Sequence, residues 1–349
     1  MDIRDAYRRL TRDEVAAAIE RRNPPRVPMV GTHWWGEGLW EQYGERLNPL
    51  AEKYPRDAYW FIDLPGLDVP RESMSWYRKE DYEGKGHDAA GVLTDWQYLD
   101  EYLEKMPERN AQGLFDKQIE QAERARAAGR YVLAGWWGLF FERPWGLRGM
   151  ANLLLDYYTE PEKVHRLHRG LCDQYKALLE RAAREIKPDG FWTSDDLGNQ
   201  RNLMMSPEQF REFLKPYYKE VGDACKKGGI HFWLHSCGNN TPILGDLAEA
   251  GLDVFHPVQK HTMDEKAVAK AYGDRLTFLV GFDVQHILQE GTPEEVRAEV
   301  RHLVDTFDRP DGGMMMAAGN GIVRGTPLEN IEAYLDETVR YGAAHRARW

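Results

Sequence analysis

One stretch of the sequence places a histidine and a cysteine two positions apart at the end of an apolar run. The stretch reads His231-Phe-Trp-Leu-His-Ser-Cys-Gly238. In an extended strand the side chains alternate between two faces, so Trp233, His235 and Cys237 would share one face. An imidazole nitrogen and a thiolate sulfur can together bind Zn²⁺ in tetrahedral geometry. The pair predicts a metal site at His235 and Cys237; the alternative is a hydrogen-bonded core histidine beside a buried thiol.

Two adjacent carboxylates, Asp195 and Asp196, stand at the end of another such run, at 190–195. If the strand persists, the two side chains point in opposite directions and one of them faces a pocket. A carboxylate in a pocket could ligate a metal, act as a general base or bind pyrrole N–H groups. The other carboxylate would cap the next turn through its side-chain oxygen. We therefore take Asp195 and Asp196 as the candidate catalytic residues.

Further aromatic, polar and charged residues follow the apolar runs elsewhere in the chain. In a barrel of parallel strands the reacting groups come from the C-terminal ends of the strands, so these positions are candidates for substrate binding. The doubled tryptophans would line a pocket for a flat, largely apolar ligand, although core packing is the more common role of such residues. The candidate substrate-binding residues are His33, Trp34, Trp35, Trp136, Trp137, His256, Gln259, Asp283 and Asn320.

The elements that must position these residues alternate between short apolar runs and helical segments. Eight such strands alternating with helices predict a (β/α)8 TIM barrel, in a single domain over residues 1–349. A doubly wound open sheet is the alternative, but no Gly-x-Gly-x-x-Gly follows the first strand. We expect extra helices before the first strand, and we expect residues 64–130 to form an insertion over the barrel mouth. The expected strands are 27–32, 58–63, 131–136, 190–195, 231–236, 252–256, 276–282 and 312–317.

Several helices are expected to begin with a capping box, in which a Ser or Thr and a Glu or Gln three residues later satisfy free backbone amides. Three histidines, His165, His168 and His302, fall within charged helical stretches, and we expect them at the surface. The candidate capping boxes begin at Thr11, Thr159, Ser206, Thr292 and Thr326.

The composition narrows the class of protein. The chain has 46 basic and 57 acidic residues, and the resulting net charge of −11 repels nucleic acid and anionic lipid. No signal-peptide core or membrane-spanning apolar run occurs, and three cysteines cannot form a disulfide framework. No phosphate loop, nucleophile elbow or His-Glu-x-x-His is present, so nucleotide hydrolysis, serine-type acyl transfer and zincin proteolysis lack support. We expect a cytoplasmic protein that acts on a small molecule, without nucleic-acid or membrane partners.

Several segments carry a family resemblance. Leu234-His-Ser-Cys-Gly-Asn239, followed by Ile243-Leu-Gly-Asp-Leu-Ala-Glu-Ala-Gly-Leu-Asp-Val-Phe-His-Pro-Val-Gln259, resembles the uroporphyrinogen decarboxylase superfamily. The segments Val280-Gly-Phe-Asp-Val-Gln285 and Thr326-Pro-Leu-Glu-Asn330 do so as well. The superfamily includes metal-free decarboxylases and corrinoid-linked methyltransferases, which use a zinc site to move methyl groups between a substrate and a corrinoid protein. The resemblance implies one of these two activities.

Two departures bear on the choice between the branches. The decarboxylases carry an Arg-Gln-Ala-Gly-Arg-Tyr segment near the N-terminus, whereas here the first strand leads into Gly31-Thr-His-Trp-Trp-Gly36, so the chain is more similar to the methyltransferases. Their thiol-activating members usually supply a further cysteine in the loop of the last strand, where this sequence has Asn320. Either the metal is held by His235, Cys237 and a carboxylate, or the metal site has been lost.

The resemblance implies a zinc-assisted methyltransferase. It would move a methyl group from a small donor, an aromatic methyl ether being one option, to a Co(I) corrinoid carried by a partner protein. Zn²⁺ would act as a Lewis acid, and Asp195 or Asp196 would protonate the leaving group or complete the ligand set. The alternatives are a metal-free decarboxylase in which Asp195 binds ring N–H groups, and a non-catalytic barrel that binds a corrinoid or another ligand.

Overall fold

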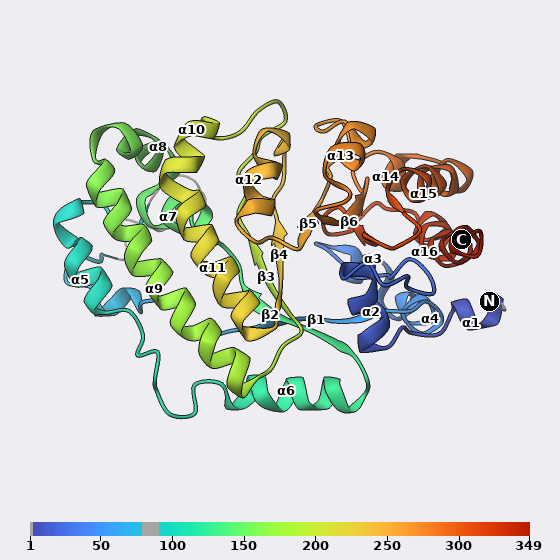
Figure 1. Cartoon of the computed structure of the whole chain (residues 1–349), viewed down its shortest axis with the longest axis horizontal. Coiled ribbons are helices and arrows are strands. Elements are labelled where there is room, and N and C mark those ends of the chain that lie inside the picture. The colour runs from blue at the N-terminus through green and yellow to red at the C-terminus, as the bar shows by residue number, and fades with distance from the viewer. Residues whose placement is uncertain (1–2, 79–90) are drawn as a thin grey trace.

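The structure is a computed structural model that describes residues 3–78 and 91–349, and its centre is a curled parallel sheet (Figure 1). The strands pair in the order β1-β2-β3-β4-β5-β6-β7, which is also their order in the sequence. Successive β–α units give this order in a barrel. The strands are β1 Ala58–Asp63, β2 Tyr131–Trp136, β3 Gly190–Ser194, β4 His231–His235, β5 Val254–His256, β6 Thr277–Phe282 and β7 Met314–Ala318.

The eighth expected strand, residues 27–32, is not a regular strand. Met29 makes one isolated parallel bridge to Met316 of β7. Pro28 has no N–H to donate, and Gly31 turns the chain with a φ of +75°, so a longer ladder does not form. The described part of the chain therefore has a TIM-barrel-like α/β fold with a seven-stranded sheet, and the regular eight-stranded barrel is not confirmed.

Helices surround the sheet, and both ends of the chain lie on the same side of the molecule (Figure 1). Among the described helices, none is long and apolar enough to span a membrane. The helices before β2 are α1 Ile3–Ala6, α2 Arg12–Ile19, α3 Leu39–Tyr43, α4 Asn48–Lys53, α5 Leu99–Glu104 and α6 Asp116–Ala127. Those between β2 and β5 are α7 Glu142–Arg148, α8 Met150–Thr159, α9 Pro161–Glu185, α10 Pro207–Gln209, α11 Lys215–Gly228 and α12 Leu244–Glu249. Those after β5 are α13 Glu265–Tyr272, α14 Ile287–Glu290, α15 Pro293–Phe307 and α16 Leu328–Arg346. Short turns of other helix types are η1 Gly44–Leu47, η2 Arg71–Ser73, η4 Trp96–Tyr98, η5 Phe210–Leu214 and η6 Thr241–Ile243.

The described part of residues 64–130 contributes two α-helices that pack on the outside of the molecule. Helix α5 packs against α9, and α6 packs along β1 and β2 on the outside of the sheet (Figure 1). None of the described residues in this segment lines the cavity at the strand ends. Residues 79–90, which belong to the same expected insertion, lie outside the described residues.

The inward-facing side chains of the strands fill the curled sheet as a packed core. Helix α2 closes the N-terminal end of this core. Its Ala18 carbonyl accepts from Gly313 N at 2.8 Å, and its Ile19 carbonyl accepts from the Thr277 hydroxyl at 3.3 Å. The C-terminal ends of the strands are therefore the end at which a site can form. The residues of this core include Tyr131, Leu133, Trp192, Trp233, Leu279 and Met315.

Three of the five expected capping boxes are confirmed, and two are wrong. Thr159 is the last residue of α8, and its hydroxyl donates to Leu155 O at 3.2 Å. The Thr326 hydroxyl likewise donates backwards, to Val323 O at 2.9 Å. A hydroxyl bonded to a preceding carbonyl does not accept from the next helix, so neither residue caps one. The confirmed boxes begin at Thr11, Ser206 and Thr292.

The sequence analysis expected His168 at the surface, and this prediction is wrong: the residue lies on the buried face of α9. Its Nδ1 donates to Phe213 O at 2.9 Å, and burial lowers its pKa to about 3. A histidine in an unfolded chain titrates near pH 6.5. Between these two pH values the unfolded state binds a proton that the folded state excludes, so stability falls as the pH drops below about 6.5.

The slope of the unfolding free energy against pH measures how many more protons the unfolded state binds than the folded state. We predict that His168→Gln lowers this difference by about one proton between pH 3 and 6.5. Urea unfolding curves recorded between about pH 5 and 7 would measure the slope for both proteins. Equal slopes would show that His168 does not carry this pH dependence.

Candidate functional site

The loops after β3 and β4 bring Asp196, His235 and Cys237 together. The loops approach so closely that a Cβ on Gly238, whose φ is +82°, would lie 2.3 Å from the carbonyl carbon of Gly198. Glycine is therefore required at this crossing. The approach lets Cys237 N donate to Asp196 Oδ1 at 2.8 Å. Cys237 lies two residues past the end of β4, and its side chain points to the same side as that of His235.

Three possible metal ligands converge at this point. Cys237 Sγ lies 3.3 Å from His235 Nε2, and Asp196 Oδ1 lies 3.7 Å from the same nitrogen. The three ligand atoms all lie within 4.8 Å of one another. Zinc with bonds of about 2.0–2.3 Å holds tetrahedral ligands roughly 3.3–3.7 Å apart, so little movement is needed to bind it. One imidazole, one thiolate and one carboxylate fit a zinc site that keeps its fourth position open.

His256 determines which nitrogen of His235 is free. His256 Nε2 lies 3.1 Å from Ala318 O, and because a carbonyl only accepts, this nitrogen carries the hydrogen. Burial lowers the pKa of both imidazoles, so both are neutral near pH 7. His235 Nδ1 therefore donates to His256 Nδ1 at 2.7 Å. This leaves the lone pair of His235 Nε2 available to a metal, as a metal-binding histidine requires.

We predict that His256→Phe weakens metal binding at His235 and Cys237 by about 10–100-fold, because the partner that sets the tautomer of His235 is lost. Competition of zinc against Co²⁺, followed by the thiolate-to-cobalt absorption band, would measure this affinity. His165→Phe is the control, since His165 bonds to the Tyr217 hydroxyl outside the site. Unchanged affinity in His256→Phe would refute the positioning role of His256.

Cys237 and Glu142 both hold a proton at neutral pH. Burial raises the pKa of the Cys237 thiol, and the nearby carboxylates of Asp196 and Glu142 raise it further. Burial, followed by the charges of Asp195 and Asp196, raises the pKa of Glu142 to about 8. A dication bound among these groups would take the place of the thiol proton and stabilise the thiolate. Sequence reasoning missed Glu142, because it begins α7 and nothing in the sequence places it beside the ends of β3 and β4.

Asp195 faces away from the possible metal ligands. Its carboxylate is fully buried, and it accepts the backbone N–H groups of residues 140–142 at 2.6–3.0 Å. It also accepts the Tyr218 hydroxyl at 2.7 Å, and burial raises its pKa to about 6 despite these bonds. Asp195 thus anchors the loop between β2 and α7. Its position does not support the catalytic role that the sequence suggested, and Asp196 is the carboxylate beside Cys237.

Of the candidate tryptophans, Trp34 and Trp137 flank His235. Their ring centroids lie 6.1 Å and 6.4 Å from the His235 ring, and the two indoles lie 6.2 Å apart. Trp192, which sequence reasoning missed, lies 6.1 Å from the same imidazole and is fully buried below it. Trp136 is buried between the sheet and the outer helices, away from the site. Three indole rings therefore surround His235.

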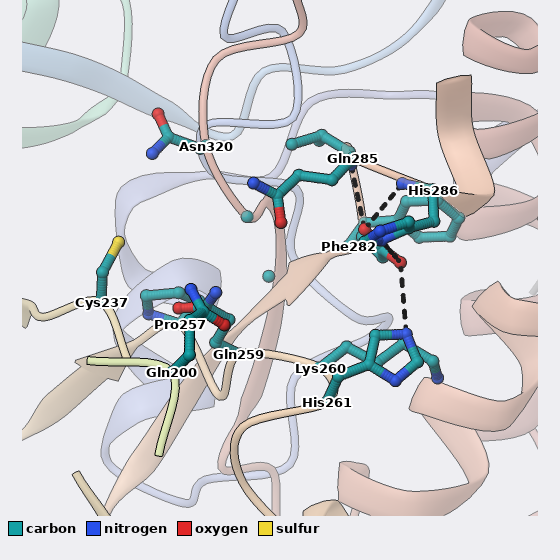
Figure 2. Close-up of a pocket in the computed structure, with 14 residues that line it drawn as sticks. Gln200, Cys237, Pro257, Gln259, Lys260, His261, Phe282, Gln285, His286 and Asn320 are labelled. Carbon is teal, nitrogen blue, oxygen red and sulfur yellow. Dashed lines mark hydrogen bonds and ion pairs between the residues drawn. The ribbon is translucent and has the colours of Figure 1, made fainter. Parts of the chain in front are cut away.

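A cavity of about 220 Å³ opens beside Cys237, between the loops that follow the later strands (Figure 2). Trp34, Trp137 and His256, which lie around His235, do not line it. Neither do His33 and Trp35, whose rings pack on each other with centroids 5.3 Å apart. Figure 2 shows that the labelled side chains come from several loops and face a common space. The lining residues that the sequence predicted as substrate-binding are Gln259, Asp283 and Asn320. Those that it missed include Gln200, His261, Gln285 and His286.

The fold and the site together define a TIM-barrel-like α/β protein with a candidate metal centre at its strand ends. The family model of uroporphyrinogen decarboxylase matches residues 145–341, a range that includes His235 and Cys237. The chain belongs to the uroporphyrinogen decarboxylase family, as its resemblance predicted.

Curated relatives include both methyltransferases and decarboxylases. The chain is 25% identical over 189 residues to the methylated-thiol–coenzyme M methyltransferase of Methanosarcina mazei, covering 54% of this chain and 48% of that protein. It is 29% identical over 141 residues to a methylcobamide:CoM methyltransferase of Methanosarcina barkeri, covering 40% of this chain and 39% of that protein. It is 25% identical over 201 residues to the uroporphyrinogen decarboxylase of Anaeromyxobacter dehalogenans, covering 56% of this chain and 54% of that protein. The chain thus spans about half the length of these relatives, or less.

A solved structure, a methyltransferase from Methanosarcina mazei, shares the fold. It aligns with a TM-score of 0.66 at 17% identity, over 95% of this chain and 99% of that one. At this identity the similarity concerns the fold alone, and it supports the TIM-barrel-like architecture.

Proposed function

We propose that this chain is a zinc-assisted methyltransferase that moves a methyl group from a small donor to a Co(I) corrinoid on a partner protein. The observation that carries the proposal is the convergence of His235 Nε2, Cys237 Sγ and Asp196 Oδ1, with the lone pair of Nε2 left free. Methylated thiols and methylcobamide, in the names of the relatives, agree with this chemistry. We also propose a cytoplasmic location, where the three free cysteines would stay reduced.

His235, Cys237 and Asp196 would hold the ion, and His256 would orient His235. When bound, zinc supplies a Lewis acid that stabilises charge developing on the oxygen or sulfur from which the methyl group departs. Asn320 stands where similar thiol-activating proteins carry a further cysteine. In our proposal the Asp196 carboxylate, and not a second thiolate, completes the protein's ligand set.

The tryptophans beside His235 would orient the donor. Trp34 and Trp137 stand at its sides, so a flat donor, such as an aromatic methyl ether, could pack against these indole rings. Fixing the donor in this way would exclude water and align the methyl group for transfer. The amides of Gln259 and Asn320, which line the cavity, would offer hydrogen bonds to its polar groups.

Glu142 is our candidate for the proton source. The methyl group leaves without the bonding electron pair, which stays on the donor atom, and that atom then needs a proton. Without a bound ion the pKa of Glu142 is about 8, so its carboxyl group holds a proton near pH 7 that it could supply. The charge of a bound dication would lower this pKa and make the proton easier to donate. The Ser194 hydroxyl donates to Glu142 Oε2 and fixes the orientation of the carboxyl group.

We predict that Glu142→Gln lowers kcat by about 100-fold without changing the metal content, because glutamine keeps the acceptor for Ser194 but has no acidic proton. Steady-state turnover and elemental analysis on the same preparations would measure both quantities. A loss of metal that parallels the loss of activity would instead make Glu142 a ligand.

The decarboxylase alternative has less support. It requires Asp195 to bind pyrrole N–H groups, but Asp195 is fully buried and its oxygens already accept backbone amides and the Tyr218 hydroxyl. A substrate could reach these oxygens only if the loop between β2 and α7 were released.

Turnover tests the proposed function. Zinc-loaded protein would be mixed with reduced corrinoid, free or protein-bound, and with either methoxylated aromatics or methyl thioethers. We expect the Co(I) absorption to be lost only when protein, zinc and a suitable donor are all present. Zinc binding without methyl transfer from either donor class would favour a binding protein, and release of CO₂ from a porphyrinogen would favour the decarboxylase.

A further inference from the structure

A second group of metal-binding side chains lines the same cavity and plays no part in the proposed methyl transfer. His261 follows β5, Asp283 follows β6 directly, and His286 stands at the start of α14. One ligand atom from each of the three lies within 4.8 Å of the other two. Figure 2 shows His261 and His286 in the part of the cavity away from Cys237.

The Asp283 carboxylate is buried, and one of its oxygens accepts no hydrogen bond from the described part of the chain. Its side chain is only 6% exposed, and Oδ1 accepts from Gln285 N and His286 N at 2.9 and 3.2 Å. Oδ2 has no hydrogen-bond partner among the described residues. A buried carboxylate oxygen without a donor is costly, so a cation is the expected partner. The nearby amine of Lys260 is already held 2.6 Å from Glu299.

The two imidazoles are placed to share such a cation. His286 Nδ1 and His261 Nε2 lie 3.5 and 3.9 Å from Asp283 Oδ2, and neither forms a hydrogen bond with it. Ligands of a tetrahedral ion with bonds of about 2.0–2.1 Å lie roughly 3.3 Å apart, so a small movement of the rings would complete the site. The two rings are 64% and 61% exposed and free to make it.

We propose that His261, Asp283 and His286 form a second binding site for a divalent transition-metal ion such as Zn²⁺. Two imidazoles and one carboxylate suit zinc, cobalt or nickel and not magnesium or calcium, which prefer oxygen ligands alone. The remaining coordination positions face the cavity and are filled by water in the absence of a ligand. This site does not depend on the proposed methyl transfer, since it shares no ligand with His235 and Cys237.

Equilibrium dialysis against Co²⁺, with the visible absorption spectrum, tests the second site and separates it from the first. Wild-type protein should bind about two ions, and only the site at Cys237 should show a thiolate-to-cobalt band. The double variant His261→Gln/His286→Gln should bind about one fewer ion and keep this band. Both rings are exposed, so the substitutions do not threaten folding. Asp283→Asn, which keeps the Oδ1 acceptor, should weaken the same site at least about 10-fold.

The control is His302→Gln, because His302 pairs with Glu265 outside the cluster, and it should bind as wild type does. In Cys237→Ser the thiolate band should vanish while an ion without sulfur ligands stays bound. If wild type shows no thiolate band, the first site is wrong, and loss of the remaining ion in the double variant still supports the second. Equal cobalt binding by wild type and the double variant would overturn the second site.

Discussion

Cys237→Ser should lose the metal held with His235 and Asp196 and retain less than about a thousandth of the methyl-transfer activity. The thiol is half-buried and its sulfur lies 3.3 Å from His235 Nε2, so a bound ion contacts it directly. Serine has nearly the same shape, but its hydroxyl does not ionise at neutral pH and is a harder ligand than a thiolate. The expected loss therefore reflects ligand chemistry and not a gap in packing.

Cys225→Ala is the matched control for this substitution. Cys225 is also a free thiol, but it is buried in α11, away from the cavity, and burial raises its pKa. The control should keep both zinc and activity, apart from a modest loss of stability from the small cavity it creates. Metal analysis after exhaustive dialysis and turnover with reduced corrinoid would compare the two variants. A Cys237→Ser protein that keeps zinc at the His235 site would refute the proposed ligand set.

Asp195→Asn should lower the free energy of unfolding by about 2–4 kcal/mol. The carboxylate is fully buried and accepts the N–H groups of residues 140–142 and the Tyr218 hydroxyl. Asparagine replaces one accepting oxygen by an NH₂ group, which would face backbone N–H groups whose acceptor among the described residues is Asp195. Those donors would remain buried and unpaired, which is the costly case for hydrogen bonds. Urea unfolding with linear extrapolation would measure the change.

The neighbouring residue is the natural control. Asp196 is partly exposed, with 35% of its side chain accessible, and Asn at this position can still accept from Cys237 N. Asp196→Asn should therefore change stability by less than about 1 kcal/mol while weakening metal binding. If Asp195→Asn proved as stable as wild type but inactive, the assignment of these two carboxylates would have to be exchanged.

Much of the sheet could be predicted from the sequence, because burial and alternation act locally. The observed bounds of β1 and β2 agree with the expected 58–63 and 131–136 to the residue. Residues 27–32 were expected to be a strand because their apolar content resembles that of the others. Pro28 and Gly31 limit their pairing to one bridge, an effect of single residues that apolar content does not reveal.

The candidate site could be predicted only where it depends on one strand. His235 and Cys237 meet because they are two residues apart in a single extended segment. Glu142 and Trp192 reach the same place from other parts of the chain. The position of Glu142 depends on the loop before α7, and that of Trp192 on the pairing of β3 with β4. The choice between Asp195 and Asp196 likewise depended on the loop between β2 and α7, whose amides surround only one of them.

X-ray absorption at the zinc edge tests the central claim most directly. Protein loaded with less than one equivalent of zinc per chain should show one sulfur neighbour at about 2.3 Å, with nitrogen and oxygen neighbours at about 2.0–2.1 Å. The sulfur signal should disappear in Cys237→Ser. A spectrum with nitrogen and oxygen neighbours alone in the His261→Gln/His286→Gln variant, which lacks the proposed second site, would contradict a metal centre built on Cys237, and with it the proposed methyl transfer.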